Sequence, residues 1–168
     1  MIEQEFLNYS GDRLQQLAGH IEDCIGRLNY DQVWTRNSAN ENSAGNLILH
    51  LCGNVRQWIG FGVGGLADHR DRNSEFATRG GLQPAQLIEQ LKSTVSEAVD
   101  IIRNVDSTRL LEKVTIQNSE VTKMRAIYQV VQHFAQHAGQ IMFVTKMLTG
   151  DDLGYFAHLN PPRAARLP

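Results

Sequence analysis

The 168-residue sequence lacks the excess of one charge that would indicate a nucleic-acid or membrane partner. Its 16 basic and 18 acidic residues leave a formal net charge of -2. Because binding to nucleic-acid phosphates or anionic lipids needs clustered positive charge, we expect neither partner. No apolar run reaches the ~18 residues of a membrane span, and the acidic start lacks the apolar segment of a signal peptide. The sequence therefore predicts a cytoplasmic protein.

Cysteine and proline are also scarce. The two cysteines, Cys24 and Cys52, fall in apolar helical patterns, so we interpret them as buried thiols of a reducing compartment and not as a disulfide framework. Three of the four prolines lie after residue 150. The length suits a single domain over 1–168, with a core of about 5–150 and an irregular tail over 151–168.

Several familiar catalytic motifs are absent. A zinc protease motif needs glutamate directly after its first histidine, and Phe134 occupies that position here. No glutamate has a histidine three residues later, which excludes the usual di-iron bundle motif. The chain has no Gly-x-Ser-x-Gly, and the glycines of 62–65 match no phosphate-binding loop.

Helical periodicity dominates what is present. Apolar residues recur at intervals of three and four over about 6–28, 43–61, 84–102 and 123–148. Ser43 and Thr122 suit helix N-caps, Pro84 suits a first turn, and Gly150 suits a helix end. A long loop over 60–81 joins the second and third helices, and weak alternation over 111–122 suggests a short β-hairpin before the fourth. We predict an all-α fold, a four-helix bundle.

Three histidines are the main candidates for chemistry. His133 and His137 are four residues apart and therefore share one face of the fourth helix. His50 lies at the border of the apolar face of the second helix, and facing helices can build a metal site from such residues. Spacing alone leaves open that these are ordinary hydrogen-bonded or solvated histidines. Polar residues near them, Asn54, Gln129 and Gln140, are candidates for lining a pocket or holding the imidazoles.

The stretches around these histidines, 42–51 and 131–141, resemble the DinB/YfiT-like superfamily of bacterial proteins, and 70–76 and 145–150 resemble one uncharacterised branch of it. The resemblance implies a four-helix bundle, usually a homodimer. It also implies one divalent cation per chain, held by His50, His133 and His137. Zinc or nickel is the expected ion, although imidazole ligands alone do not fix the metal.

Characterised members of this superfamily include S-transferases and isomerases that use low-molecular-weight thiols. We find no acidic residue beside the three histidines in the sequence, so hydrolysis lacks an obvious general base. Asp68, Asp71 and Glu75 of the long loop are the nearest candidates, but we interpret them as solvated charges. The leading hypothesis is transfer of a small thiol to an electrophilic small-molecule substrate. The alternatives are a metal-dependent hydrolase and a non-catalytic metal-binding or stress-response protein. The sequence assigns no catalytic residue beyond the metal ligands.

Overall fold

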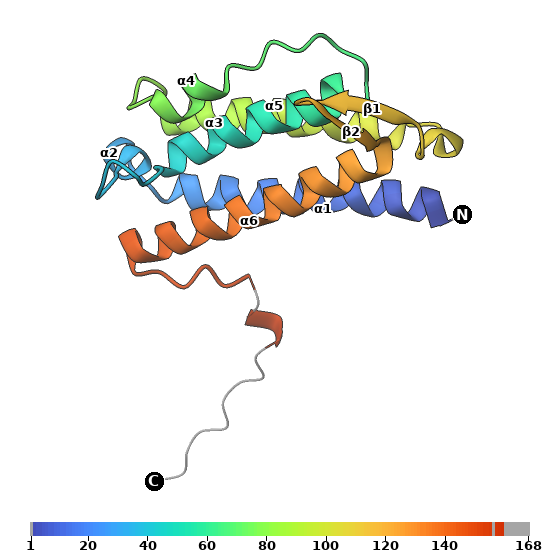
Figure 1. Ribbon diagram of the computed structural model, residues 1–168. Coiled ribbons are helices and arrows are strands. Elements are labelled where there is room, and N and C mark those ends of the chain that lie inside the picture. The colour runs from blue at the N-terminus through green and yellow to red at the C-terminus, as the bar shows by residue number, and fades with distance from the viewer. Residues whose placement is uncertain (1, 156, 160–168) are drawn as a thin grey trace, which may run out of the picture.

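The computed structural model describes residues 2–155 and 157–159 and is mostly helical, with one small sheet (Figure 1). The four long helices are α1 (Ile2–Gly26), α3 (Ala44–Val55), α5 (Pro84–Arg103) and α6 (Lys123–Thr149). A π-helical segment, Arg56–Phe61, continues α3. The short helices are α2 (Tyr30–Trp34) and α4 (Arg72–Ala77), and two single 3₁₀ turns span Ser107–Arg109 and Ala157–Leu159. The prediction of a mainly helical protein is therefore confirmed.

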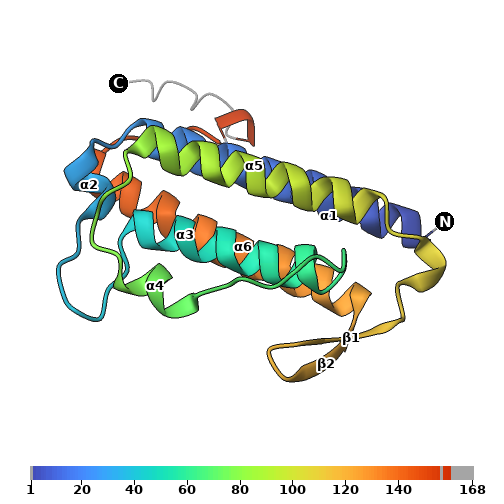
Figure 2. The same ribbon diagram turned by 90° about the horizontal axis from the view of Figure 1, so that it is seen from above.

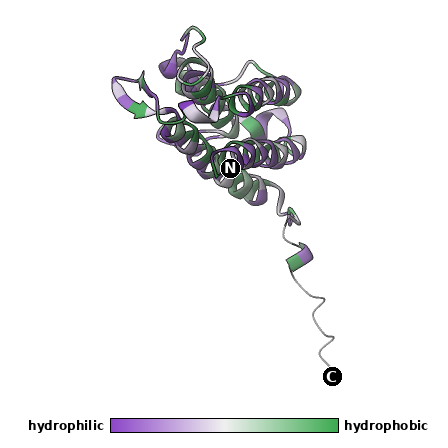
Figure 3. Ribbon diagram, turned by 90° about the vertical axis from the view of Figure 1, so that its right-hand side faces the viewer, coloured by the Kyte–Doolittle hydropathy of each residue, from purple (hydrophilic) through white to green (hydrophobic). Residues whose placement is uncertain are grey.

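The long helices lie side by side (Figures 1 and 2). Helix α1 packs against α5 and α6, and α3 also packs against α5 and α6. In Figure 2, α3 and α5 run in one direction while α1 and α6 run in the other. Each helix carries hydrophobic and hydrophilic residues (Figure 3), and its apolar face turns inward. The antiparallel contact of α3 with α6 brings the middle of the two histidine-bearing helices together.

Local signals explain most helix ends. Ser43 caps α3 by accepting a hydrogen bond from the Asn46 backbone, and Thr122 caps α6 by accepting one from the Arg125 backbone. Pro84 begins α5, where its missing N–H costs nothing. Gly150 ends α6 with a left-handed φ of 75°, a conformation that glycine adopts without strain.

The connection over 60–81 differs from the predicted loop because it contains helix α4, whose first turn is capped by the Asp71 side chain. The predicted hairpin is present as strands β1 (Lys113–Ile116) and β2 (Ser119–Thr122), which pair antiparallel. Its turn residues, Gln117 and Asn118, both have positive φ, as the tight two-residue turn requires.

The tail contacts the body of the protein through Tyr155. Its hydroxyl donates to Asp23 on α1 at 2.7 Å, and its ring stacks on His20 with the centroids 4.1 Å apart. The aromatic ring of Tyr155 therefore covers part of His20. Residues 160–168 of the predicted irregular tail lie outside the described residues. Within the described part, no helix combines the length and the hydropathy needed to cross a bilayer.

Candidate metal centre

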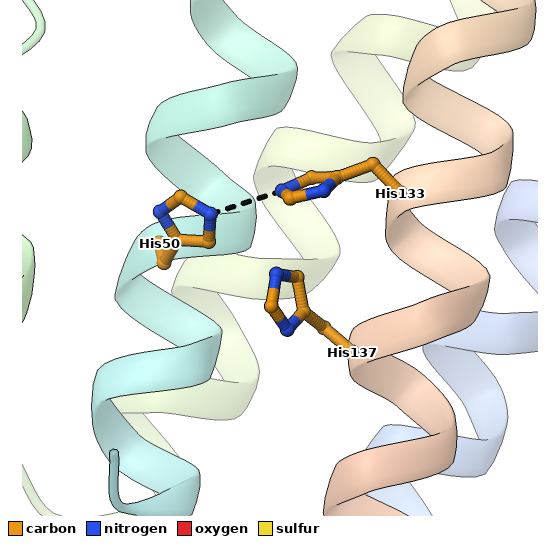
Figure 4. Close-up of side chains that lie close together, drawn as sticks. All are labelled: His50, His133 and His137. Carbon is orange, nitrogen blue, oxygen red and sulfur yellow. Dashed lines mark hydrogen bonds between the residues drawn. The ribbon is translucent and has the colours of Figure 1, made fainter. Parts of the chain in front are cut away.

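The structure brings His50, His133 and His137 together at the contact of α3 with α6 (Figure 4). His50 is buried, with 5% of its surface exposed, while His133 and His137 are half-buried. The intervening Phe134 points the other way and is fully buried in the core. This division follows from helical geometry, since residues four apart share a face and their immediate neighbours do not.

The three rings meet edge to face. The Nε2 atoms of His50 and His133 are 2.9 Å apart. The ring centroid of His137 lies 5.1 Å from that of His50 and 4.5 Å from that of His133. One ring nitrogen from each histidine falls within a set of atoms that all lie within 4.8 Å of one another. Such convergence of nitrogen lone pairs is typical of a cation site.

Hydrogen bonds on the outer side of two rings fix which nitrogen faces inward. The Nδ1 atom of His50 lies 2.8 Å from a Glu75 carboxylate oxygen, and Nδ1 of His137 lies 2.6 Å from the Gln140 side-chain oxygen. Because both partners are acceptors, each Nδ1 carries the proton and each Nε2 keeps a lone pair. Metal-binding histidines are commonly held in this way by a second residue behind the ring.

Glu75 is itself held firmly. The Arg70 guanidinium donates to both of its carboxylate oxygens, at 2.7 and 2.9 Å, and the Asn46 side chain donates to its backbone carbonyl at 2.9 Å. Only 6% of Glu75 is exposed. Burial by itself raises the pKa of Glu75, but the hydrogen bonds from Arg70 and His50 outweigh it and lower the pKa overall. The carboxylate therefore stays ionised behind His50.

Glycine at position 53 makes room for this carboxylate. A Cβ atom built on Gly53 would meet a carboxylate oxygen of Glu75 at 1.9 Å, which is far inside van der Waals contact. Glycine inside a helix costs about 1 kcal/mol relative to alanine. The close approach of Glu75 is the physical reason for that cost at this position.

Further polar contacts join the loop that contains Arg70 to the turn of the β-hairpin, through Gln57 just after the C-terminal end of α3. The side-chain oxygen of Gln57 accepts from Arg70 at 2.9 Å and from Gln117, in the hairpin turn, at 2.7 Å. The amide nitrogen of Gln57 donates to Asp68 at 2.8 Å. The loop, the π-helical segment and the hairpin thus form one hydrogen-bonded frame around Arg70.

The environment keeps His133 and His137 neutral. Burial lowers the pKa of His133 to about 4, and the neighbouring charges of His137, His50 and two arginines act in the same direction. Burial also lowers the pKa of His137, against a smaller opposing effect from its bond to Gln140. Neutral imidazole is the form that binds metal ions.

These residues fit a divalent cation. Zinc–imidazole bonds of about 2.0–2.1 Å place ligand nitrogens about 3–3.5 Å apart, close to the His50–His133 separation. Among the described residues, no cysteine, aspartate or glutamate joins the three histidines as a fourth ligand. Catalytic zinc sites commonly have three protein ligands, whereas structural zinc sites usually have four.

The structure places the other three predicted site residues in different surroundings. The side-chain oxygen of Gln140 accepts a hydrogen bond from His137. Asn54 is 8% exposed, and its side-chain oxygen has no hydrogen-bond partner within the described residues. Gln129 is exposed on α6, and nothing in the structure tests a role for it.

The interpretation of Glu75 as a solvated loop charge is wrong. The only signal in the sequence was an arginine five residues before a glutamate in a polar loop, which is a common surface pattern. Asp68 and Asp71 are exposed, as expected, but each has a local hydrogen-bond role.

Comparison with known proteins agrees with this geometry. The model of a family described as proteins of unknown function, DUF1572, matches residues 1–163. The chain belongs to the DUF1572 family. No curated protein matches the DUF1572 chain.

Two solved structures share the fold of this DUF1572 chain. A conserved protein from Enterococcus faecalis has a TM-score of 0.73 and 13% identity, over 85% of this chain and 96% of its own. The DinB-like protein YjoA from Bacillus subtilis has a TM-score of 0.67 and 13% identity, over 88% of this chain and 97% of its own. The fold is therefore shared with a DinB-like protein, and the match to a family of unknown function agrees with the predicted resemblance to an uncharacterised branch.

Proposed function

We propose that this protein is a metal-dependent enzyme that transfers a small thiol to an electrophilic substrate. The observation that carries the proposal is the convergence of His50, His133 and His137 with no fourth ligand among the described residues. In this proposal the helices form a DinB-like four-helix bundle, and the protein is a cytoplasmic homodimer. Each chain holds one zinc or nickel ion. A divalent cation bound there would lower the pKa of a thiol or water that shares its coordination sphere.

The residues around the site have two roles, which are to bind the cation and to orient the histidine rings. The inward Nε2 atoms of the three histidines hold the cation, while Glu75 and Gln140 keep two of the rings in the metal-binding tautomer. In the transfer, the thiol loses its proton to solvent and its sulfur forms a bond to an electrophilic carbon. The leaving group departs from that carbon with the bonding electron pair.

The position of Glu75 favours thiol transfer over hydrolysis. Hydrolysis of a substrate by water generally needs a carboxylate or another base near the attacking oxygen. Glu75 lies behind His50, on the far side of the ring from Nε2, and is occupied by Arg70. It can orient His50 but cannot reach a nucleophile at the open side of the site. A small thiol needs less help, because its pKa is already much lower than that of water.

The first experiment measures bound metal in purified protein and in His50→Ala. The wild-type chain should hold about one divalent ion, and the variant should hold almost none because two imidazoles alone bind weakly. His69→Ala is the matched control, since His69 is an exposed loop histidine outside the cluster. Full metal occupancy in His50→Ala would refute the three-histidine site.

The second experiment tests the reaction. Metal-loaded protein is incubated with cysteine as the thiol and a chromogenic aryl halide as the electrophile, with and without a chelator. Chelator-sensitive product formation that is lost in His50→Ala supports transfer. Chelator-sensitive ester hydrolysis without thiol consumption would support the hydrolase instead, and a fully loaded protein inactive in both assays would support a sensor or storage role.

A further inference from the structure

A cavity of about 600 Å³ lies beside the Arg70–Glu75 pair, and none of the three histidines lines it. Its floor is a strip of α3 made of Leu49, Gly53 and Arg56, and the connection over 67–78 forms the opposite wall. The volume is within the range of small-molecule sites. This cavity is separate from the metal site, although Glu75 borders both.

The cavity has an apolar end and a cationic end. Leu49 on α3 and Leu82, two residues before the start of α5, line one end, and Arg56 at the C-terminal end of α3 and Gln90 on α5 lie further along the two helices. Helices α3 and α5 run in the same direction (Figure 2), so both pairs are ordered alike along the cavity. At 1.5 Å per residue, the seven residues from Leu49 to Arg56 separate the two ends by about 10 Å.

The charged groups in the lining are not equally available to a ligand. Asp68 accepts hydrogen bonds from Gln57 and from the Arg70 backbone, and Asp71 accepts two from the first turn of α4. Arg70 and Glu75 are paired with each other. The carboxylates and one of the two arginines are therefore already used by the fold.

Arg56 is the exception. Its guanidinium has no hydrogen bond or ion pair with any described residue. Glu89 shares an adjoining hollow with Arg56, but no ion pair joins the two side chains. Arg56, the arginine of the cavity lining without a partner among the described residues, thus lies about 10 Å along α3 from Leu49, and this combination complements an acid group on an apolar chain.

We propose that this cavity binds an amphipathic monoanion, a carboxylic acid with an apolar body of about eight carbons. Its carboxylate lies beside Arg56 and Gln90, and its chain covers Leu49 and Leu82. The proposal does not depend on the metal or on the proposed reaction.

A tryptophan already present can report on this cavity. The indole of Trp34 donates to the backbone carbonyl of Leu82 at 3.0 Å, directly behind the apolar end. The chain has two tryptophans, so Trp58→Phe leaves Trp34 as the single fluorophore. The Trp58 N–H is buried without a partner, and the substitution therefore removes no hydrogen bond.

The test titrates metal-free Trp58→Phe protein with octanoate, octylamine and octanol, which share one chain length but differ in charge. Octanoate should saturate the change in Trp34 fluorescence at one molecule per chain, with the amine and the alcohol weaker by about tenfold, the loss usual for a charge-assisted hydrogen bond. Calorimetry on the unsubstituted protein checks the stoichiometry. Equal binding of all three probes, or no octanoate binding at millimolar concentration, would overturn the proposal.

Two arginine variants locate the anion. Arg56→Gln should weaken octanoate binding by about tenfold and leave octanol unchanged, because only the acid group contacts the guanidinium. Arg72→Gln is the matched control, since Arg72 is exposed, stacks on Phe76 and does not line the cavity. If both variants weaken octanoate equally, the attraction is general to the surface and the cavity assignment is wrong.

Discussion

The two halves of the helical body bury different kinds of side chain. On α1 and α5 the buried residues are mostly apolar. The buried polar side chains there are Ser10 and Thr94. Thr94 donates to the Gln90 backbone of its own helix and also bonds to the Cys52 thiol. Helix α3 buries Asn46, His50 and Asn54, and the first two bond to other elements. The α1–α5 contact thus stabilises the protein, while the contacts of α3 with α4 and α6 also fix the positions of specific polar groups.

Truncation in the apolar half should have the largest effect on stability. Leu91 on α5 is fully buried, so Leu91→Ala should lower the free energy of unfolding by about 2–5 kcal/mol. Because Leu91 is not part of the histidine cluster, the variant should still bind one metal ion at temperatures where it is folded. Urea denaturation and metal analysis measure the two effects. Loss of metal from folded Leu91→Ala would contradict the division between the halves.

Two helical glycines should respond in opposite directions. Gly53→Ala on α3 would place its Cβ against Glu75, so we expect a loss of about 1–3 kcal/mol and weaker metal binding. Gly19→Ala on α1 meets nothing within 4 Å and should gain up to about 1 kcal/mol from helix propensity. Thermal unfolding of both variants gives the comparison. If Gly53→Ala and Gly19→Ala changed the stability equally, Glu75 would not be held against α3 in solution.

Removing the charge behind His50 should affect metal binding more than folding. Glu75→Gln can still accept a hydrogen bond from His50 but no longer neutralises Arg70, so metal affinity should fall by about 10–100-fold. The control is Glu97→Gln on α5, an exposed carboxylate with no ion pair within the described part of the chain. Competition with a chromogenic chelator measures the affinity. An unchanged affinity in Glu75→Gln would remove the role of the carboxylate in orienting His50.

The smallest expected effect is a pH dependence in the metal-free protein. His133 has a folded pKa of about 4, below its ordinary value of 6.5. Between these values the unfolded chain binds a proton that the folded chain does not. The contribution of His133 to the free energy of unfolding is therefore complete above pH 6.5 and is lost as pH falls toward 4. Allowing for solvent screening of a half-buried ring, the loss from pH 7 to 5 is about 1 kcal/mol. His133→Gln should show a shallower loss in urea denaturation at the two pH values, and an identical slope would refute this contribution.

Much of the fold could be predicted because its signals are local. The starts of α5 and α6 at Pro84 and Lys123, and the end of α6 before Gly150, follow from residues at those positions. The helix α4 was missed, since its six residues contain only two apolar side chains and show no clear period. Its N-cap, Asp71, is visible in the sequence but is a weak signal without an apolar face behind it.

Some features of the candidate site could also be predicted from local sequence, and others could not. His133 and His137 share a face in any helix, and Gln140 lies three residues further on, within reach of His137. The role of Glu75 and Arg70 could not be predicted, because they are 25 and 20 residues from His50 and reach it only when the connection folds back over α3. The need for glycine at position 53 could not be predicted for the same reason, since Glu75, which lies against it, belongs to that connection.

The sequence by itself determined four amphipathic helices, their caps and the pair of histidines on one helical face. These features depend on interactions between residues at most a few turns apart. The spacing of the residues left the place of His50 open, and the tertiary structure brings His50 to that pair, with the buried Glu75 behind it. The tertiary structure also decided that Arg56 faces a cavity without a partner. Each of these depends on chain segments far apart in sequence, and packing of the apolar faces brings those segments together before any polar contact can form.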